Sequence, residues 1–232
     1  MDITDADQDC EESVSFNELS MREDYRVDIR RGPSLTAAEN TVAYENFRSN
    51  PSVLKIVSLC QHSPRTKLHA GNFGRWNFNG DGPSAPPPPP RQGSMGCIVT
   101  MPGAGDQAVH ADCPHIFDHA QLPPHYINMF GIGRNSGFDI GQTAFIRGSH
   151  KLQECAIFTE NKAEMNRHLV RPHLKAGDIV MFDCRILHFG TSNSGDAWRP
   201  VVYTNYWREF YEDPKNWDAR KKLFGPENSS LK

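Results

Sequence analysis

The residue pattern from His69 onward places the strongest limit on the fold. Short apolar or alternating runs follow one another there, separated by Gly, Pro, Asn and Asp. Many such runs in succession are typical of the strands and turns of a β-barrel or sandwich. The predicted strands are Lys67–Phe73, Cys97–Met101, Ala108–Asp112, Tyr126–Ile132, Thr143–Ile146, Leu169–His173, Ile179–Asp183, Ile186–Phe189 and Val201–Trp207. The sequence therefore predicts a mainly β core over residues 67–212.

Two helices are expected ahead of this core. Thr36 and Glu39 have the spacing of a capping box, and Asn50 is a helix cap followed by a first-turn proline. Apolar positions follow both helix starts, so residues 36–66 are predicted to form a helical buttress against the strands.

Three further segments are assigned from composition. Residues 1–35 are acidic and then mixed in charge, which predicts a flexible N-terminal arm. Residues 213–232 begin with Asp-Pro and predict a C-terminal helix and tail. The five prolines Pro86–Pro90 predict a stiff surface loop over residues 85–91. A proline-reading domain is a candidate partner there, although a plain loop insertion is the simpler interpretation.

Composition excludes several classes of protein. A net charge of -3 gives no basic excess for nucleic acid, and no apolar run approaches the roughly 18 residues of a membrane span. The acidic start lacks a secretory signal, and the terminal SSLK has the letters of a peroxisomal signal in the wrong order. A cytoplasmic protein is expected. The six cysteines show no CxxC pair or regular spacing, which favours reduced thiols over a disulfide framework.

The segment His110-Ala111-Asp112 carries the first sign of chemistry. On a strand, the period of two places both side chains on one face, so an imidazole and a carboxylate converge. His188 is the best candidate for a third ligand because it lies in a second apolar run, ILHFG, after the buried-strand pattern GDIVMFD. Two histidines and one carboxylate form the facial triad of non-haem iron(II) oxygenases.

Arg199 adds a site for a carboxylate. It follows His188 by eleven residues, across a turn over residues 191–195, so a hairpin would bring it alongside the metal ligand. A guanidinium holds a carboxylate with two parallel hydrogen bonds. That property suits the far carboxylate of 2-oxoglutarate.

At this point the chain resembles the phytanoyl-CoA dioxygenase family of 2-oxoglutarate oxygenases. The matching stretches are QAVHADCPHIF, LPPHYINMF, GQTAFIRGSHK and GDIVMFDCRILHFGTSNSGDAWRPVVYTNYW, in the family's order over roughly residues 95–210. The resemblance implies a double-stranded β-helix, that is, a jelly-roll or cupin-like barrel, with flanking helices. It also implies iron(II) on His110, Asp112 and His188, and 2-oxoglutarate on Arg199. Gln107 and Thr143 would be further cosubstrate contacts.

The implied reaction uses dioxygen and 2-oxoglutarate to hydroxylate a small organic substrate, lipid-like or a secondary metabolite, with release of succinate and CO2. Arg147 stands where the family's Gly-Ser-His turn begins with proline, and no acyl-CoA specificity is inferred. Candidate pocket-lining aromatic residues are Phe117, Phe130, Trp198 and Trp207.

Two other functions are compatible with the same residues. A zinc hydrolase also uses two histidines, a carboxylate and a water, but the chain has no HExxH motif to supply a general base. A non-catalytic β-helix could serve as a binding module. The presence of all three ligands together with Arg199 favours the oxygenase.

Overall fold

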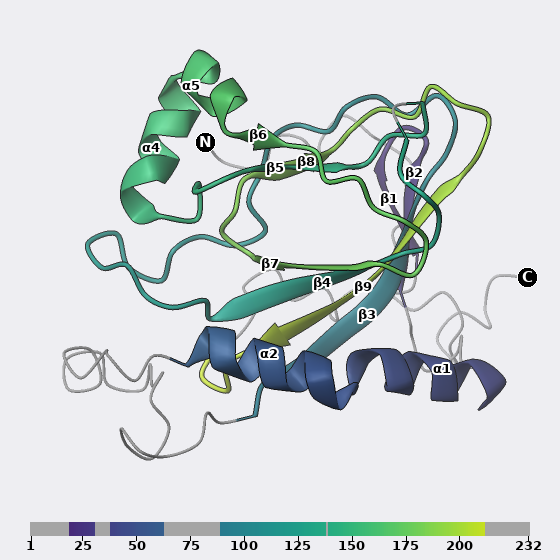
Figure 1. The fold of residues 1–232 in the computed structure, drawn as a ribbon, viewed down its shortest axis with the longest axis horizontal. Helices are drawn as coiled ribbons and strands as arrows, with labels where there is room; N and C mark the ends of the chain where they lie inside the picture. The colour runs from purple at the N-terminus through teal and green to yellow at the C-terminus, as the bar shows by residue number, and fades with distance from the viewer. Residues whose placement is uncertain (1–18, 31–37, 63–88, 138, 212–232) are drawn as a thin grey trace, which may run out of the picture.

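Two antiparallel sheets face each other in the computed structural model, which describes residues 19–30, 38–62, 89–137 and 139–211 (Figure 1). The larger sheet has six strands in the order β1-β2-β3-β9-β4-β7, and the smaller has three in the order β6-β5-β8. The strands are β1 (Leu19–Glu23), β2 (Arg26–Arg30), β3 (Arg91–Thr100), β4 (Tyr126–Ile132), β5 (Thr143–Ile146), β6 (Leu169–Val170), β7 (Ile179–Asp183), β8 (His188–Gly190) and β9 (Arg199–Trp207). The predicted sheet-rich, antiparallel architecture is confirmed.

Strand boundaries agree best where apolar alternation is strong. The bounds of β4, β5 and β7 are those predicted from the sequence. The structure begins β3 six residues before the predicted start, because cross-strand pairing to β9 extends over polar and glycine residues. The predicted strand at residues 108–112 is wrong: only a single bridge forms there, between His110 and His188. The predicted strand at residues 67–73 lies outside the described residues.

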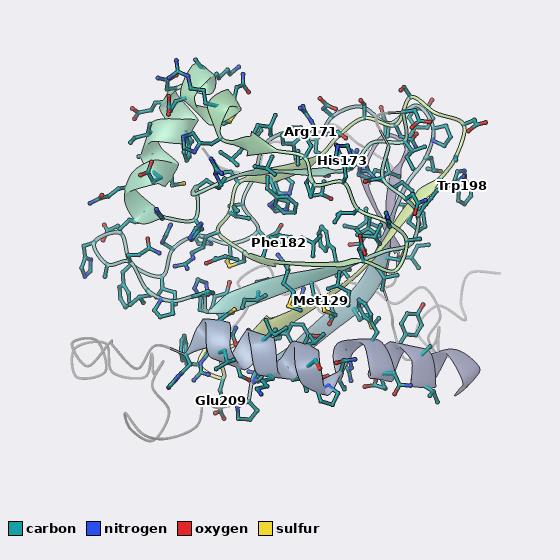
Figure 2. The ribbon with its side chains drawn as sticks, viewed as in Figure 1. Met129, Arg171, His173, Phe182, Trp198 and Glu209 are labelled. Atoms are coloured by element: carbon teal, nitrogen blue, oxygen red, sulfur yellow. A yellow bond between two sulfur atoms is a disulfide. The ribbon has the colours of Figure 1, made fainter. Side chains whose placement is uncertain are left out.

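Two helices, α1 (Ala38–Arg48) and α2 (Pro51–Gln61), lie within the segment for which a helical buttress was predicted. Asn50 caps α2, since its side chain accepts hydrogen bonds from the N–H groups of Ser52 (3.0 Å) and Val53 (3.4 Å). The helix packs on the outer face of the large sheet, where Met129 lies between the two layers (Figure 2). The buried cluster at this contact is Val53, Val57, Ile127, Met129 and Tyr206. Each such side chain contributes roughly 1.5–3 kcal/mol by leaving water.

The prediction of a flexible N-terminal arm is wrong for residues 19–30. These residues form the β1–β2 hairpin, and β2 pairs with β3 so that the hairpin extends the large sheet. Arg26 and Asp28 are 1% and 0% exposed, so these two charged side chains of β2 are buried. The charged residues of this segment had led us to predict that it is exposed to solvent. The strand that pairs with it, β3, lies some 70 residues further along the chain.

Two short helices were not predicted. The segment after β5 forms α4 (Leu152–Glu160) and α5 (Lys162–Arg167) before the chain returns to β6 (Figure 1). Four of the apolar residues of α4 are consecutive, at positions 155–158, and α5 has only six residues, so neither segment shows the spacing of an amphipathic helix. The predicted C-terminal helix and the prolines 86–88 lie outside the described residues, and Arg91 of the predicted proline loop belongs to β3. No helix in the described part of the chain is both long and apolar enough to cross a membrane.

Candidate metal centre

The two candidate histidine ligands lie opposite each other in a backbone bridge. His110 N–H donates to His188 O (3.0 Å), and His188 N–H donates to His110 O (2.9 Å). A hydrogen-bonded antiparallel pair places both side chains on the same face. The two imidazole rings consequently lie with their centroids 4.5 Å apart. This local pairing replaces the strand that the sequence predicted around His110.

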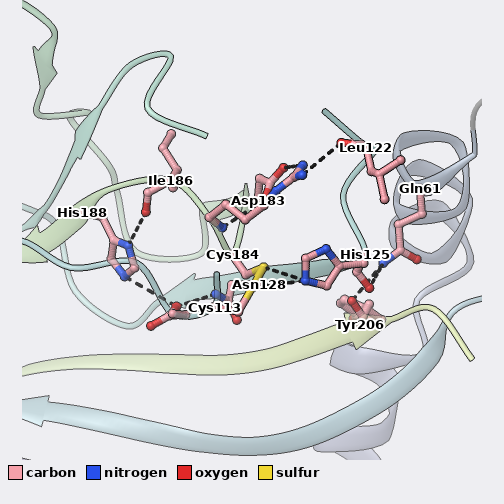
Figure 3. Close-up of a disulfide and its surroundings, with 12 residues drawn as sticks. Gln61, Cys113, Leu122, His125, Asn128, Asp183, Cys184, Ile186, His188 and Tyr206 are labelled. Atoms are coloured by element: carbon pink, nitrogen blue, oxygen red, sulfur yellow. Dashed lines mark hydrogen bonds and ion pairs between the residues drawn. A yellow bond between two sulfur atoms is a disulfide. The ribbon is translucent and has the colours of Figure 1, made fainter. Parts of the chain in front are cut away.

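Asp112 completes the group. Its backbone N–H donates to Cys184 O (2.9 Å), which holds the carboxylate beside the bridge. Asp112 Oδ1 lies 3.8 Å from His110 Nε2, and Oδ2 lies 3.6 Å from His188 Nε2. Asn128 Nδ2 donates to Oδ2 at 2.6 Å (Figure 3). The ligand atoms of all three residues lie within 4.8 Å of one another.

Hydrogen bonds on the far side of each ring orient the two imidazoles. His110 Nδ1 lies 2.8 Å from Ala108 O, and His188 Nδ1 lies 3.0 Å from Ile186 O. A carbonyl only accepts, so each Nδ1 donates, and Nε2 is the nitrogen whose lone pair is available to a metal ion in the neutral ring. Two neutral nitrogen ligands and one carboxylate on one side of a point fit a divalent metal ion and leave other coordination positions open.

Phenylalanine rings form the wall behind His188. The Phe182 and Phe145 centroids lie 5.0 and 6.0 Å from the His188 ring, and Phe130 packs edge-on to Phe182 at 4.8 Å. Figure 2 shows Phe182 between the two sheets. Trp198, in contrast, is 61% exposed at the rim, so the expectation that it lines an interior pocket is wrong.

A cavity of about 420 Å³ includes Phe182 in its lining. Its lining residues are Gln121, Leu122, Pro124, His150, Met181, Phe182, Asp183, Arg185 and Ile186. Arg185 and Asp183 pair with each other, and Arg185 Nη1 also donates to Leu122 O (3.0 Å). The cavity therefore combines apolar surface with a fixed, already paired set of charges. Phe182 joins it to the wall of the metal centre.

Gly190 is the point at which the three predicted cosubstrate residues meet. Gln107 Oε1 accepts from Gly190 N–H (2.9 Å), and Thr143 is the cross-strand partner of Gly190 on β5. A β-carbon at Gly190 would lie 2.8 Å from Gln107 Oε1 and 3.2 Å from Arg199 Nη2. A side chain there would thus collide with the polar groups, which is a physical reason for glycine. Gly190 follows His188 by two residues on the same strand, so this polar end adjoins the metal centre.

Arg199 reaches Gly190 from the opposite sheet. The predicted hairpin is wrong, because β8 belongs to the small sheet and β9 to the large one. Arg199 is 7% exposed, and burial, together with the nearby charge of Arg26, lowers its pKa to about 10. Its Nη1 donates to Thr191 O (3.2 Å) and Ile140 O (3.4 Å), while Nε has no hydrogen-bond partner among the described residues.

Two polar residues of this region were missed in the sequence. Asn128 interrupts the apolar run YINMFGI, which is a signal that could have been used. Arg26 lies in a segment assigned to the flexible arm, and nothing local in the sequence distinguishes it from a surface arginine.

A disulfide joins Cys113 and Cys184 beside the metal centre (Figure 3). The expectation of reduced thiols is therefore wrong for this pair, because the N–H groups of Asp112 and Cys113 bond Cys184 O and bring together residues 71 apart in sequence. His125 Nε2 lies 3.5 Å from Cys113 Sγ, and burial lowers the His125 pKa to about 3. Cys113, His125 and Cys184 also have the spacing of a metal site. Sulfurs bonded to each other are not thiolate ligands, however.

Facing antiparallel sheets with two histidines and one carboxylate between them define a class, the β-sandwich proteins with a 2-His-1-carboxylate metal site. The family model of phytanoyl-CoA dioxygenase (PhyH) matches residues 89–201, a stretch just under half of this chain. The matched region contains His110, Asp112, His188 and Arg199.

Individual relatives are distant. Dioxygenase af480 of Aspergillus fumigatus is 27% identical over 123 residues, which cover 53% of this chain and 39% of the relative. The chain thus spans well under two thirds of that protein. The crystal structure of SnoN, a non-haem α-ketoglutarate-dependent epimerase from nogalamycin biosynthesis, is 15% identical with a TM-score of 0.51. The match covers 79% of this chain and 61% of SnoN. HygX of Streptomyces hygroscopicus, solved with nickel and 2-oxoglutarate, is 11% identical with a TM-score of 0.49, covering 84% and 75%.

Proposed function

We propose that this protein is an iron(II)- and 2-oxoglutarate-dependent oxygenase that hydroxylates a small organic substrate. The observation that carries the proposal is the convergence of His110, Asp112 and His188 beside a polar end formed around Gly190. The residues that would bind a metal ion and the arginine that would bind a carboxylate, Arg199, then lie close together between the two sheets. We also propose that the two sheets are those of a double-stranded β-helix, which supplies this arrangement.

The triad would hold iron(II) through His110 Nε2, His188 Nε2 and the Asp112 carboxylate. When bound, iron(II) with dioxygen and 2-oxoglutarate supplies the oxidising power for hydroxylation, with release of succinate and CO2. Asn128 fixes the orientation of Asp112 by donating to Oδ2. The hydrogen bonds from the two Nδ1 atoms to backbone carbonyls fix the ring orientation and leave each Nε2 turned toward the centre.

Arg199 would bind the distal carboxylate of 2-oxoglutarate. Its unpartnered Nε and its partly used Nη2 are donors of the kind that a carboxylate accepts in pairs. Gln107 and Thr143 would help to form the same end, through their contacts with Gly190. Arg199 is buried, so little water is available to hydrate its guanidinium group. A bound anion would compensate for that lost hydration.

The cavity behind Phe182 is the candidate substrate pocket. Its volume of about 420 Å³ suits a small molecule, and its lining is mixed in polarity. Gln121 and His150 are the polar groups there that could select a substrate by hydrogen bonding. The pocket and the arginine end would then lie on different sides of His188.

The test is reconstitution of the protein with iron(II) and 2-oxoglutarate, followed by measurement of succinate with a panel of candidate substrates. Succinate formation that needs iron and is stimulated by one substrate class supports the proposal. Each alanine substitution of His110, Asp112 and His188 should abolish it. Hydrolysis that needs zinc would support the hydrolase instead, and metal-independent ligand binding without turnover would support a binding module.

A further inference from the structure

Two uncharged polar residues, Gln121 and His150, line the candidate substrate pocket, and they differ in what they can offer a ligand. The Gln121 amide is engaged at both ends, because Nε2 donates to Leu122 O (3.3 Å) and Oε1 accepts from Leu152 N–H (2.7 Å). Neither ring nitrogen of His150 hydrogen-bonds to another described residue. A bound molecule could therefore engage His150 without breaking a bond within the protein.

The turn that carries His150 is fixed relative to the metal centre. Ser149 is 0% exposed, and its Oγ accepts from the N–H of Leu187 (2.7 Å), the residue before His188. On the other side, Gln121 Nε2 donates to His150 O (3.5 Å). These bonds place His150 before any ligand arrives, so little ordering is needed when one binds.

The charges in the pocket wall already compensate each other. Asp183 and Arg185 form an ion pair, and the Arg185 side chain is 2% exposed. Arg185 Nε donates to Asp183 Oδ1 (2.8 Å), and Nη1 donates to Leu122 O (3.0 Å). A charged group of a ligand would have to displace a member of this pair or enter without a counter-charge. Both are costly, so the pocket favours an uncharged ligand.

His150 itself is suited to an uncharged partner. Burial lowers the pKa of His150 from its ordinary value of 6.5, and the positive charge of Arg185 also lowers it, while Asp183 acts in the opposite direction. A neutral imidazole offers one N–H donor and one acceptor nitrogen. A hydroxyl group both donates and accepts, so it can match either nitrogen.

The rest of the pocket is mostly apolar and adjoins the metal centre. The Phe182 ring lies with its centroid 5.0 Å from that of His188, and Ile186 O lies 3.0 Å from His188 Nδ1. Both residues also line the pocket. The apolar lining residues are Leu122, Pro124, Met181, Phe182 and Ile186. A ligand body packed on this surface would lie beside a candidate metal ligand.

We infer that the substrate is an uncharged, largely apolar molecule with a hydroxyl group, and that His150 is the specificity-determining residue that binds this hydroxyl. The inference rests on the proposed function and deepens it by naming a substrate class. The Asp183–Arg185 pair would act against charged molecules of similar size.

The test is ligand-observed NMR with three probes that share one ring: benzyl alcohol, toluene and benzoate. Their affinities are measured on the zinc(II)-loaded protein, and manganese(II) then replaces zinc(II) so that enhanced relaxation reports a probe close to the metal. The variants are His150→Phe, His150→Leu and His150→Gln. The matched control is His119→Phe, since the His119 side chain is 70% exposed. Thermal unfolding is recorded for each variant.

We expect benzyl alcohol to bind ~10-fold or more tightly than benzoate, with relaxation enhanced by manganese(II). His150→Phe should lower the ratio of the benzyl alcohol affinity to the toluene affinity by roughly 2- to 10-fold, the scale of one hydrogen bond between uncharged groups. His150→Gln should keep most of the ratio, because an amide also donates and accepts, and His119→Phe should keep all of it. His150→Leu carries the test if His150→Phe does not fold.

A purely structural His150 would change the affinities of both neutral probes equally or not at all, and either result overturns its assigned role. Tighter binding of benzoate would show that Arg185 accepts a ligand carboxylate, and it would overturn the substrate class. Absence of relaxation enhancement would overturn the placement of the substrate in this pocket. The proposed function fails separately, through a metal-loaded protein that neither binds 2-oxoglutarate nor forms succinate, and the probe affinities are measured without either.

Discussion

Replacement of Asn128 by alanine tests how the metal centre is organised. Asn128 is 4% exposed, and its Nδ2 donates to Asp112 Oδ2 at 2.6 Å. A hydrogen bond to a charged group is worth ~1.5–3 kcal/mol, which is about 10- to 100-fold in an equilibrium constant. The Asp112 side chain is 30% exposed, so water replaces part of the lost contact. We therefore expect metal affinity to fall by roughly tenfold, the lower end of that range.

The assay is titration with cobalt(II), followed by its visible absorption, with a competing chelator to extend the range. The matched control is Asn161→Ala, which removes the exposed N-cap of α5, where Asn161 Oδ1 accepts from Glu164 N–H (3.1 Å). That variant should bind cobalt as the unsubstituted protein does. A folded Asn128→Ala protein with unchanged cobalt affinity would refute the argument that Asn128 positions Asp112 for the metal. A similar loss in both variants would show a general effect of destabilisation.

Three other perturbations have definite expected outcomes. Arg199→Lys should raise the KM for 2-oxoglutarate in a succinate assay, because lysine lacks the paired N–H groups; an unchanged KM would place the cosubstrate elsewhere. Met129→Ala should lower the free energy of unfolding by about 2–5 kcal/mol in urea titrations, since Met129 is fully buried under α2; a loss below 1 kcal/mol would contradict that packing. Burial lowers the His125 pKa from 6.5 to about 3. As the pH falls below 6.5, His125 takes up a proton in the unfolded chain but not in the folded protein. The free energy of unfolding should therefore fall by up to about 1.4 kcal/mol per pH unit between pH 6.5 and pH 3. His125→Phe should flatten this slope, and equal slopes in both proteins would show that His125 is not kept neutral.

Local pattern determined most strands and the candidate ligands. Apolar alternation defined β4, β5 and β7 with the bounds that the structure shows. The His-x-Asp spacing identified two candidate ligands, but the predicted strand does not hold them; the His110–His188 bridge and the bond from Asp112 N–H to Cys184 O do. The helix cap at Asn50 was equally local, since its acceptor bonds N–H groups two and three residues ahead.

Only the tertiary structure decided which distant residues meet. Arg26 and Arg199 are neighbours because β2, β3 and β9 pair in a particular register, and register depends on every strand and turn between them. The same applies to Asn128 and Asp112, whose side chains meet through a hydrogen bond. It also applies to Cys113 and Cys184, which a backbone hydrogen bond brings together; no sequence spacing encodes either contact. A buried charge is the extreme case: in the sequence Arg26 has the composition of a surface residue, and its burial follows from strands that begin some 65 residues later.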